Sequence, residues 1–280
     1  MTPLERLCYW ITERESIRIK KESGRPWPWT DDTILREWRF CNVNRCDDRE
    51  TRWIFENIIA PHHQSSVLWF NLVIARFINW APTLCDLGFV DPWDAVEFKR
   101  VIETIQERDL KIYTGAYMIP GGPKGIAKHD FLAQSVFGPL WDRRDDVPKG
   151  STTWCVSWAD FFRPTPGMGD FLINQVITDM KYTHHLKGAP DWNTFVLAGP
   201  GTQRGLNRLF GLQLSHKWDQ LAAKKGLLKL REDLQAERVL IESPYIFDDL
   251  NNLSNCMCEY DKYCRVLFGE GTPRARYVPQ

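Results

Sequence analysis

Apolar residues recur at helical spacing through most of this sequence, and this feature constrains the fold more than any other. One clear instance is the set Phe98, Val101, Ile102 and Ile105. Such spacing places apolar side chains on one face of an α-helix. The alternation of apolar and polar residues that marks a half-buried strand is confined to two short segments, 111–118 and 194–197. The sequence therefore predicts an all-α fold, with short strands expected at most in those two places.

The predicted helices are separated by turns rich in Pro and Gly, such as 119–125 and 164–169. They span residues 4–11, 33–38, 49–59, 65–79, 93–107, 152–162, 169–180, 202–210, 221–232 and 250–267. None of the turns is long or of low complexity, as a flexible linker would be. We therefore expect a single helical domain over residues 1–280, built of two lobes, with a helix-hairpin-helix-like element at about 191–210.

Composition excludes several classes of protein. The 36 basic and 36 acidic residues balance, and 43% of the chain is apolar, so disorder is not expected. No run approaches the ~18 uncharged apolar residues of a membrane span, and charges interrupt the N-terminal segment where a signal peptide needs an apolar stretch. Eight thinly spread Cys indicate reduced thiols. The 13 Trp suit a large helical core and also stacking on nucleic-acid bases.

The first candidate site is the segment 197–209, LAGPGTQRGLNRL. A Gly-x-Gly turn followed by a helix is typical of helix-hairpin-helix elements, whose amides face a DNA phosphate. Residues 201–232 contain seven basic and two acidic side chains, a net charge of +5. We therefore expect the turn 199–201 to be exposed beside Arg204 and Arg208 as a DNA contact. The alternative is a glycine turn between two core helices. The sequence contains no Gly-x4-Gly-Lys-Ser/Thr phosphate loop.

The second candidate site is the segment 38–52, WRFCNVNRCDDRETR. Its directional polar groups beside aromatic residues indicate recognition of a polar planar group, with Arg39 or Arg45 available for phosphate. The alternative, equally open, is a salt-bridged helix start capped by Asp48.

The third segment, 255–276, contains Cys256, Cys258 and Cys264, but their spacing matches neither zinc knuckles nor an iron–sulfur motif. We expect neither metal nor cofactor. Glu259 and Lys262 have the spacing of a surface ion pair. The six His residues show no ligand or catalytic pattern, and surface or capping roles are expected for them.

Five segments, occurring in order, carry a resemblance that is more specific than any one of them. They are 39–48, 114–117, 169–182, 198–208 and 258–274. Together they resemble the helical domain associated with phage 5-hydroxymethyldeoxyuridine (5-hmdU) DNA kinases, which is akin to the alpha-glutamyl/putrescinyl thymine pyrophosphorylases, or amino acid:DNA transferases. The likeness runs from about residue 36 to 277, nearly the whole chain.

The resemblance implies thymine hypermodification in phage DNA, in the cytoplasm of an infected bacterium. A kinase places pyrophosphate on the 5-hydroxymethyl group of a uracil base, and a transferase replaces it with an amino acid or polyamine. The family resembles helix-hairpin-helix DNA glycosylases in architecture. Gln203 occupies the position where a lyase-type glycosylase has its nucleophilic Lys, so cleavage of the sugar is not expected.

The needs of this chemistry and the matching segments indicate roles for individual residues. Asp48 or Asp179 is expected to be the general base, with Arg45 acting on the leaving pyrophosphate. The predicted substrate contacts are Arg39, Asn42, Asn44, Tyr117, Gln175, Asp261 and Lys262. The predicted DNA contacts are Gly199, Gly201, Thr202, Gln203, Arg204, Arg208 and Arg274.

The expected partners are duplex DNA with a flipped modified base, a small amine and a 5-hmdU DNA kinase, with no membrane. Two further hypotheses stay open. One is a non-catalytic DNA-binding module that serves a separate 5-hmdU DNA kinase, and the other is a DNA base glycosylase.

Overall fold

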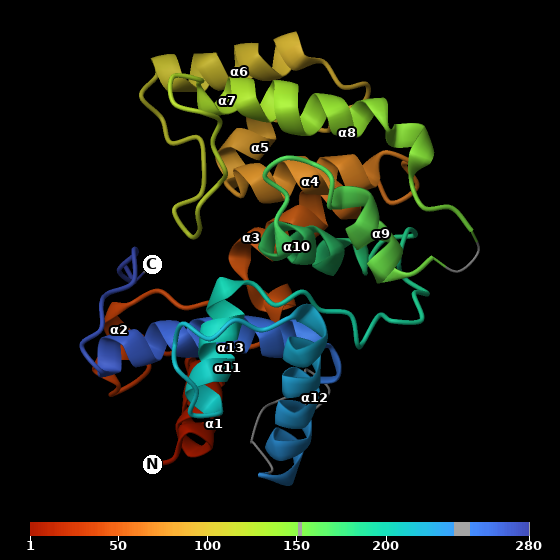
Figure 1. Ribbon diagram of the computed structural model, residues 1–280. Helices are drawn as coiled ribbons and strands as arrows, with labels where there is room; N and C mark the ends of the chain where they lie inside the picture. The colour runs from red at the N-terminus through yellow and green to blue at the C-terminus, as the bar shows by residue number, and fades with distance from the viewer. Residues whose placement is uncertain (151–152, 238–246, 280) are drawn as a thin grey trace. The chain divides into compact units, whose positions relative to one another are not determined.

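The structure, a computed structural model, describes residues 1–150, 153–237 and 247–279. These residues are helical or irregular throughout, and the sole β-type pairing among them is an isolated antiparallel bridge between Trp38 and Arg276. The all-α prediction is confirmed (Figure 1). The chain divides into two compact units, unit 1 with Met1–Asp48 and Asn193–Gln280, and unit 2 with Arg49–Trp192.

Unit 1 is built around its C-terminal helix. Its elements are α1 (Pro3–Glu22), α2 (Thr33–Glu37), the 3-10 turn η1 (Arg45–Asp47), α11 (Pro200–Leu209), α12 (Gln220–Ala236) and α13 (Leu250–Leu267). Side-chain caps begin several of these helices; Asp249, for example, accepts a hydrogen bond from the amide of Asn251 at the start of α13. Helix α13 is buried along most of its length because α1, α2, α11 and α12 all pack on it.

Two glycines let α11 lie unusually close to α13. A Cβ atom added at Gly201 would come 2.3 Å from the Sγ of Cys258, and one at Gly205 would come 2.2 Å from the carbonyl oxygen of Met257. At Gly205 only a residue without a Cβ fits, because the clash is with backbone, whereas at Gly201 the Cys258 side chain would have to move. The glycines of the GPGTQRG segment therefore serve close helix packing, as the alternative interpretation of that segment anticipated.

Unit 2 surrounds the wholly buried helix α4 with aromatic side chains. Its elements are α3 (Arg49–Ile54), the π-helix η2 (Phe55–Ile59), α4 (Leu68–Ile78), α5 (Ala81–Leu87), α6 (Ala95–Glu107), α7 (Lys128–Phe131), the π-helix η3 (Leu132–Phe137), α8 (Gly138–Asp142), the 3-10 turn η4 (Arg144–Asp146), α9 (Cys155–Phe162) and α10 (Asp170–Met180). Trp69 on α4 contacts Trp158 and Phe162 of α9, with ring centroids 5.7 and 6.1 Å away. Phe70 contacts Phe137 of η3 at 6.3 Å.

Several local predictions need correction. Segments 111–118 and 194–197 are irregular, because their backbone groups are not paired into a ladder with another segment. Helix α5 and the helical stretch 128–142 were not predicted, since their apolar spacing is interrupted. The predicted helix start at Thr152 lies outside the described residues.

His185 was expected at the surface, but it is half-buried against Trp158. Within the described part of the chain, no helix has the length and apolarity that crossing a bilayer requires.

Candidate functional site

The segment 40–48 in unit 1 is held in place by polar side chains of α13. The amide of Cys41 donates to Oε2 of Glu259 at 2.9 Å, and the amide of Arg45 donates to Oδ1 of Asn252 at 3.0 Å. Both acceptor residues are buried. A segment whose regular structure is limited to the turn η1 thus acquires a defined backbone, and its side chains are held in fixed positions.

Asp48 lies at the end of this segment among cationic groups. It accepts a hydrogen bond from the amide of Asn42 at 2.8 Å and forms an ion pair with Nη1 of Arg45. The Asp48 side chain keeps 16% of its surface exposed. Burial raises the pKa of Asp48, and this effect outweighs the opposing influence of Arg45 and Arg14.

Arg14 of α1 completes the cluster, and the sequence-based analysis missed it. Its Nε donates to the carbonyl of Cys41 at 3.0 Å and its Nη2 to Oδ1 of Asn42 at 2.5 Å. Its Nη1 is buried and has no hydrogen-bond partner in the structure. Burial lowers the pKa of Arg14, although nearby acidic groups such as Asp48 oppose this. We call Arg14, Arg45 and Asp48 the Arg–Asp cluster.

The two asparagines predicted as substrate contacts help to fold this segment. Nδ2 of Asn42 donates to the carbonyl of Asp47 at 2.7 Å, and Oδ1 of Asn44 accepts from the amide of Cys46 at 3.1 Å as the cap of η1. Arg39 is exposed, and its amide bonds to the carbonyl of Ala275 at 3.2 Å.

Lys262 forms the predicted pair with Glu259 at 2.6 Å, but not on the surface as expected, because the Glu259 side chain is only 8% exposed. Its ammonium group also lies 4.9 Å from the ring centroid of Phe40.

The basic side chains of α11 meet acidic groups from elsewhere in unit 1. Asp261 of α13 pairs with Arg204 at 3.2 Å, with Arg208 at 2.7 Å and with Arg265 at 3.5 Å. Arg208 also pairs with Glu270. Its side chain is only 7% exposed, whereas that of Arg204 is 38% exposed. The +5 count along the chain therefore overstates the local charge.

The predicted DNA-binding turn is only partly at the surface. Gly199 is buried, Pro200 is exposed and Gly201 is half-buried, so the expectation of a fully exposed turn is wrong at Gly199 because the turn packs onto the core. The buried hydroxyl of Thr202 donates to the carbonyl of Ser254 at 2.9 Å. Gln203 donates to the carbonyl of Ala198 at 3.1 Å. Arg274 is exposed.

In unit 2, the predicted base Asp179 is paired with Arg76 of α4. The Arg76 Nε and Nη2 atoms bond to the two carboxylate oxygens at 2.6 and 2.5 Å, and both side chains are 2% exposed. The hydroxyl of Tyr117 donates to the carbonyl of Arg76 at 2.6 Å. Gln175 is buried on α10, one turn before Asp179.

The structure thus brings two predicted site residues of unit 2, Asp179 and Tyr117, together through Arg76. The sequence does contain a signal for the role of Arg76, because it is an arginine inside the apolar run LWFNLVIARFI. The Arg–Asp cluster and Asp179 belong to different units. Among the described residues, no group of three or more His, Cys, Asp or Glu side chains is arranged to hold a metal ion.

Comparisons with known proteins give one consistent result. The sequence model of a family described as "5-hmdU DNA kinase, helical domain" matches residues 2–272. A curated relative, the 5-hmdU DNA kinase of Bacillus phage SP10, is 22% identical over 227 residues. The aligned region is 71% of this chain and 35% of the relative, so the chain spans about a third of that protein's length. No solved structure matches the chain.

Proposed function

Since the chain belongs to the family of 5-hmdU DNA kinase helical domains, we propose that it acts on DNA bases derived from 5-hydroxymethyluracil. The specific reaction that we propose is transfer of an amine. The amine nitrogen forms a bond to the exocyclic methylene carbon, the carbon–oxygen bond breaks, and pyrophosphate leaves with the bonding electrons. One proton of the incoming ammonium passes to a carboxylate of the protein.

The observation that carries this proposal is the Arg–Asp cluster. A general base works best when its pKa is nearer the working pH than that of a free carboxylate. Asp48 is partly exposed and its pKa is raised by burial, so it meets this requirement. The guanidinium groups of Arg45 and Arg14 supply positive charge where pyrophosphate develops its negative charge. The Nη1 atom of Arg14 is buried, so Arg14 contributes its charge to the cluster and not a contact that solvent can reach.

The contacts of Asp179 favour a different role for that residue. Both of its oxygens accept from Arg76, and it is nearly inaccessible at 2% exposure. A base must reach the proton that it removes. We therefore assign the role of general base to Asp48. The role of Asp179 is to position Arg76.

The proposal keeps only those predicted DNA contacts that are accessible to solvent. Arg204, Arg274 and Pro200 are the accessible members of the predicted set, and the α11 N-terminus is favourable for a phosphate. We also propose a helix-hairpin-helix architecture like that of DNA glycosylases, and the same Gly-x-Gly turn is the feature that supports it. Gln203 bonds to backbone groups and offers no amine nucleophile, which argues against a lyase.

The test uses DNA that contains 5-pyrophosphoryloxymethyluracil, incubated with the protein and glycine, serine or putrescine. Mass spectrometry of the digested nucleosides should show the aminated base, with pyrophosphate release and no free base. Asp48→Asn should slow the reaction and leave DNA affinity nearly unchanged. Asp47→Asn is the matched control, because that carboxylate lies next in sequence and pairs with Arg18 at 3.6 Å. Equal loss in both variants would contradict the role of Asp48, and release of free base would indicate a glycosylase.

A second candidate function is favoured by the length of the relative. The matched region is 35% of a protein named as a kinase, and this chain contains no phosphate-loop string. The domain would then bind the modified DNA for a 5-hmdU DNA kinase. The result that would favour it is an unchanged base with every amine, together with binding of the DNA and a higher rate of an added kinase.

A further inference from the structure

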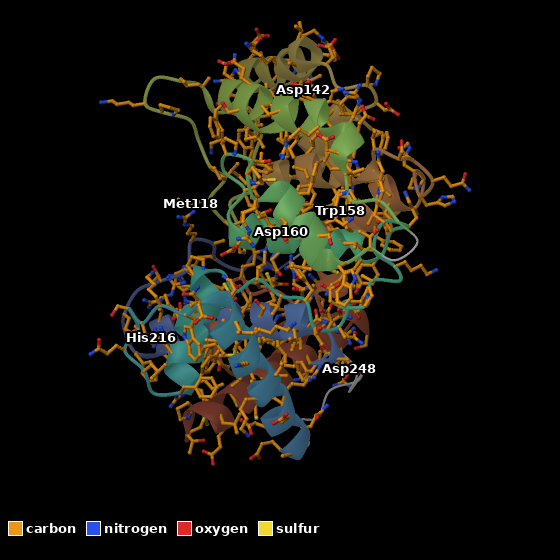
Figure 2. All side chains as sticks on the ribbon, turned by 45° about the vertical axis from the view of Figure 1, so that its right-hand side comes forward. Met118, Asp142, Trp158, Asp160, His216 and Asp248 are labelled. Carbon is orange, nitrogen blue, oxygen red and sulfur yellow. The ribbon has the colours of Figure 1, made fainter. Side chains whose placement is uncertain are left out.

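The connection between α6 and α7 in unit 2 is a loop with an unusual charge pattern. Residues 110–128, which follow Asp109 and end at Lys128, the first residue of α7, contain Lys111, Lys124 and Lys128 and no acidic residue, in a chain whose net charge is zero. Met118, within this loop, is 72% exposed. Figure 2 labels it on the loop, outside the helices of its unit. We call residues 110–128 the lysine loop.

The position of Met118 is imposed by its two neighbours. Tyr117 is held inward by its hydrogen bond to the Arg76 carbonyl and by an edge contact with Phe171, with ring centroids 5.1 Å apart. Ile119 is buried at 7% exposure. Tyr117 is directed inward and Ile119 is buried, and Met118 between them is the residue that lies at the surface. An apolar side chain is therefore presented to solvent by a fixed backbone.

The rest of the lysine loop is anchored at its beginning and after Met118. The amide of Thr114 donates to the carbonyl of Ile78 at 3.0 Å, and the Thr83 hydroxyl donates to the carbonyl of Ile112 at 2.9 Å. Gly122 packs so closely on Phe131 that an added Cβ would lie 2.9 Å from it. The loop is thus held in shape before any partner binds, and little conformational entropy remains to be lost on binding.

We propose that the lysine loop is a DNA-binding element in which Met118 inserts between base pairs while the lysines contact phosphates. This inference rests on the proposed function, since it takes duplex DNA as the partner. An exposed apolar side chain in a segment that carries three lysines and no acidic residue complements a duplex, which offers stacked bases inside two lines of phosphate. Apolar wedges of this kind unstack a base step and so lower the cost of moving a base out of the helix.

Lys111 and Lys128 add aromatic packing to their charge. The ammonium group of Lys111 lies 3.8 Å from the ring centroid of Trp80, and that of Lys128 lies 4.9 Å from the ring centroid of Tyr113. These contacts limit the motion of both side chains while their charge still acts on nearby phosphates. Lys124 is exposed near the glycines of the loop.

The experiment measures binding to a 20-base-pair duplex with one 5-hydroxymethyluracil, flanked by the fluorescent base 2-aminopurine, which brightens on unstacking. The unchanged protein should bind and raise the fluorescence. Met118→Ser should abolish the rise and weaken binding about ten-fold, as expected for the loss of one wedge. The triple change of Lys111, Lys124 and Lys128 to Gln should lower the salt slope of log Kd by about 2 to 3.

Two matched controls come from the same unit. Val96 on α6 is an apolar residue with 76% exposure outside the lysine loop, and Val96→Ser should change neither signal. Lys187→Gln removes one exposed lysine from elsewhere in unit 2 and should change the salt slope less than the triple variant does. Helical content measured by circular dichroism establishes that each variant is folded.

The outcomes separate this inference from the proposed function. If the unchanged protein binds DNA but Met118→Ser retains both the affinity and the fluorescence rise, the lysine loop proposal fails and amine transfer is unaffected. If Met118 is required but no amine is transferred to pyrophosphorylated DNA, the transferase proposal fails and the loop proposal stands. If the unchanged protein binds no duplex at low salt, both fail.

Discussion

The substitution Gly205→Ala should destabilise unit 1, because α11 lies against the backbone of α13 at this residue. The new Cβ would meet the carbonyl oxygen of Met257 at 2.2 Å and its carbonyl carbon at 2.7 Å, about 1 Å short of ordinary contact. No side-chain rotation relieves a clash with backbone, so the helices must separate. Overpacking of this kind costs about 1–3 kcal/mol, and a gap of 0.5–1 Å elsewhere along the interface also loses dispersion energy.

Helix propensity acts in the opposite direction and must be subtracted. Ala in a helix interior is favoured over Gly by about 1 kcal/mol. We therefore expect a net loss of about 1 kcal/mol in the free energy of unfolding of unit 1, to which the lost dispersion energy adds. Gly226→Ala on α12 is the matched control, because its Cβ would contact only side chains, the nearest being Phe210 at 3.4 Å. That variant keeps the propensity gain and should be neutral or more stable.

The assay is urea unfolding followed by far-ultraviolet circular dichroism, with limited proteolysis to identify which unit opens first. Gly205→Ala should shift the transition of unit 1 and leave that of unit 2 in place. If Gly205→Ala were as stable as Gly226→Ala, the close approach of α11 and α13 would be refuted, and with it the structural explanation of the GPGTQRG glycines.

Three further predictions concern buried and titrating groups. Asp179→Asn should destabilise unit 2 by about 3–5 kcal/mol, because it leaves the Arg76 charge buried, whereas the double change of both residues to Leu should recover much of this loss in urea unfolding. Burial lowers the pKa of His185 to about 3 in the folded protein. As pH falls below about 6.5, the unfolded chain therefore binds a proton at His185 that the folded chain does not, and unit 2 should lose stability. His185→Phe should remove that slope. If Asp48 is the base, its raised pKa predicts that the transfer rate increases across mildly acidic pH, above the ordinary value of 3.8, and a rate independent of pH down to about 4 would contradict the assignment.

The sequence predicted the helical class correctly because helix periodicity is a local property. Short or interrupted helices were missed for the same reason, since α5 and the stretch 128–142 depend on tertiary packing around π-helical and proline-containing turns. The short strands expected at most at 111–118 and 194–197 do not form; residues 195–197 are all buried, so the sequence pattern there does not correspond to alternating buried and exposed faces.

Charge was harder to predict than fold. The count over residues 201–232 cannot include Asp261 or Glu270, which lie far along the chain and pair with Arg208 in the folded unit. Arg14 gave no signal either, because an arginine on an amphipathic helix is ordinary. Its importance follows only from the fold, which buries its Nη1 beside the segment that ends at Asp48.

Arg76 connects Asp179 and Tyr117, two predicted site residues of unit 2. Asp179 neutralises the Arg76 side chain inside the core, and the carbonyl of the same residue accepts the hydroxyl of Tyr117. Tyr117 in turn keeps Met118 at the surface of the lysine loop. A buried ion pair contributes little net stability compared with apolar packing, so its value here is that it fixes the geometry of a neighbouring surface. Asp179→Asn should therefore weaken the fluorescence rise on duplex DNA even under conditions where unit 2 stays folded.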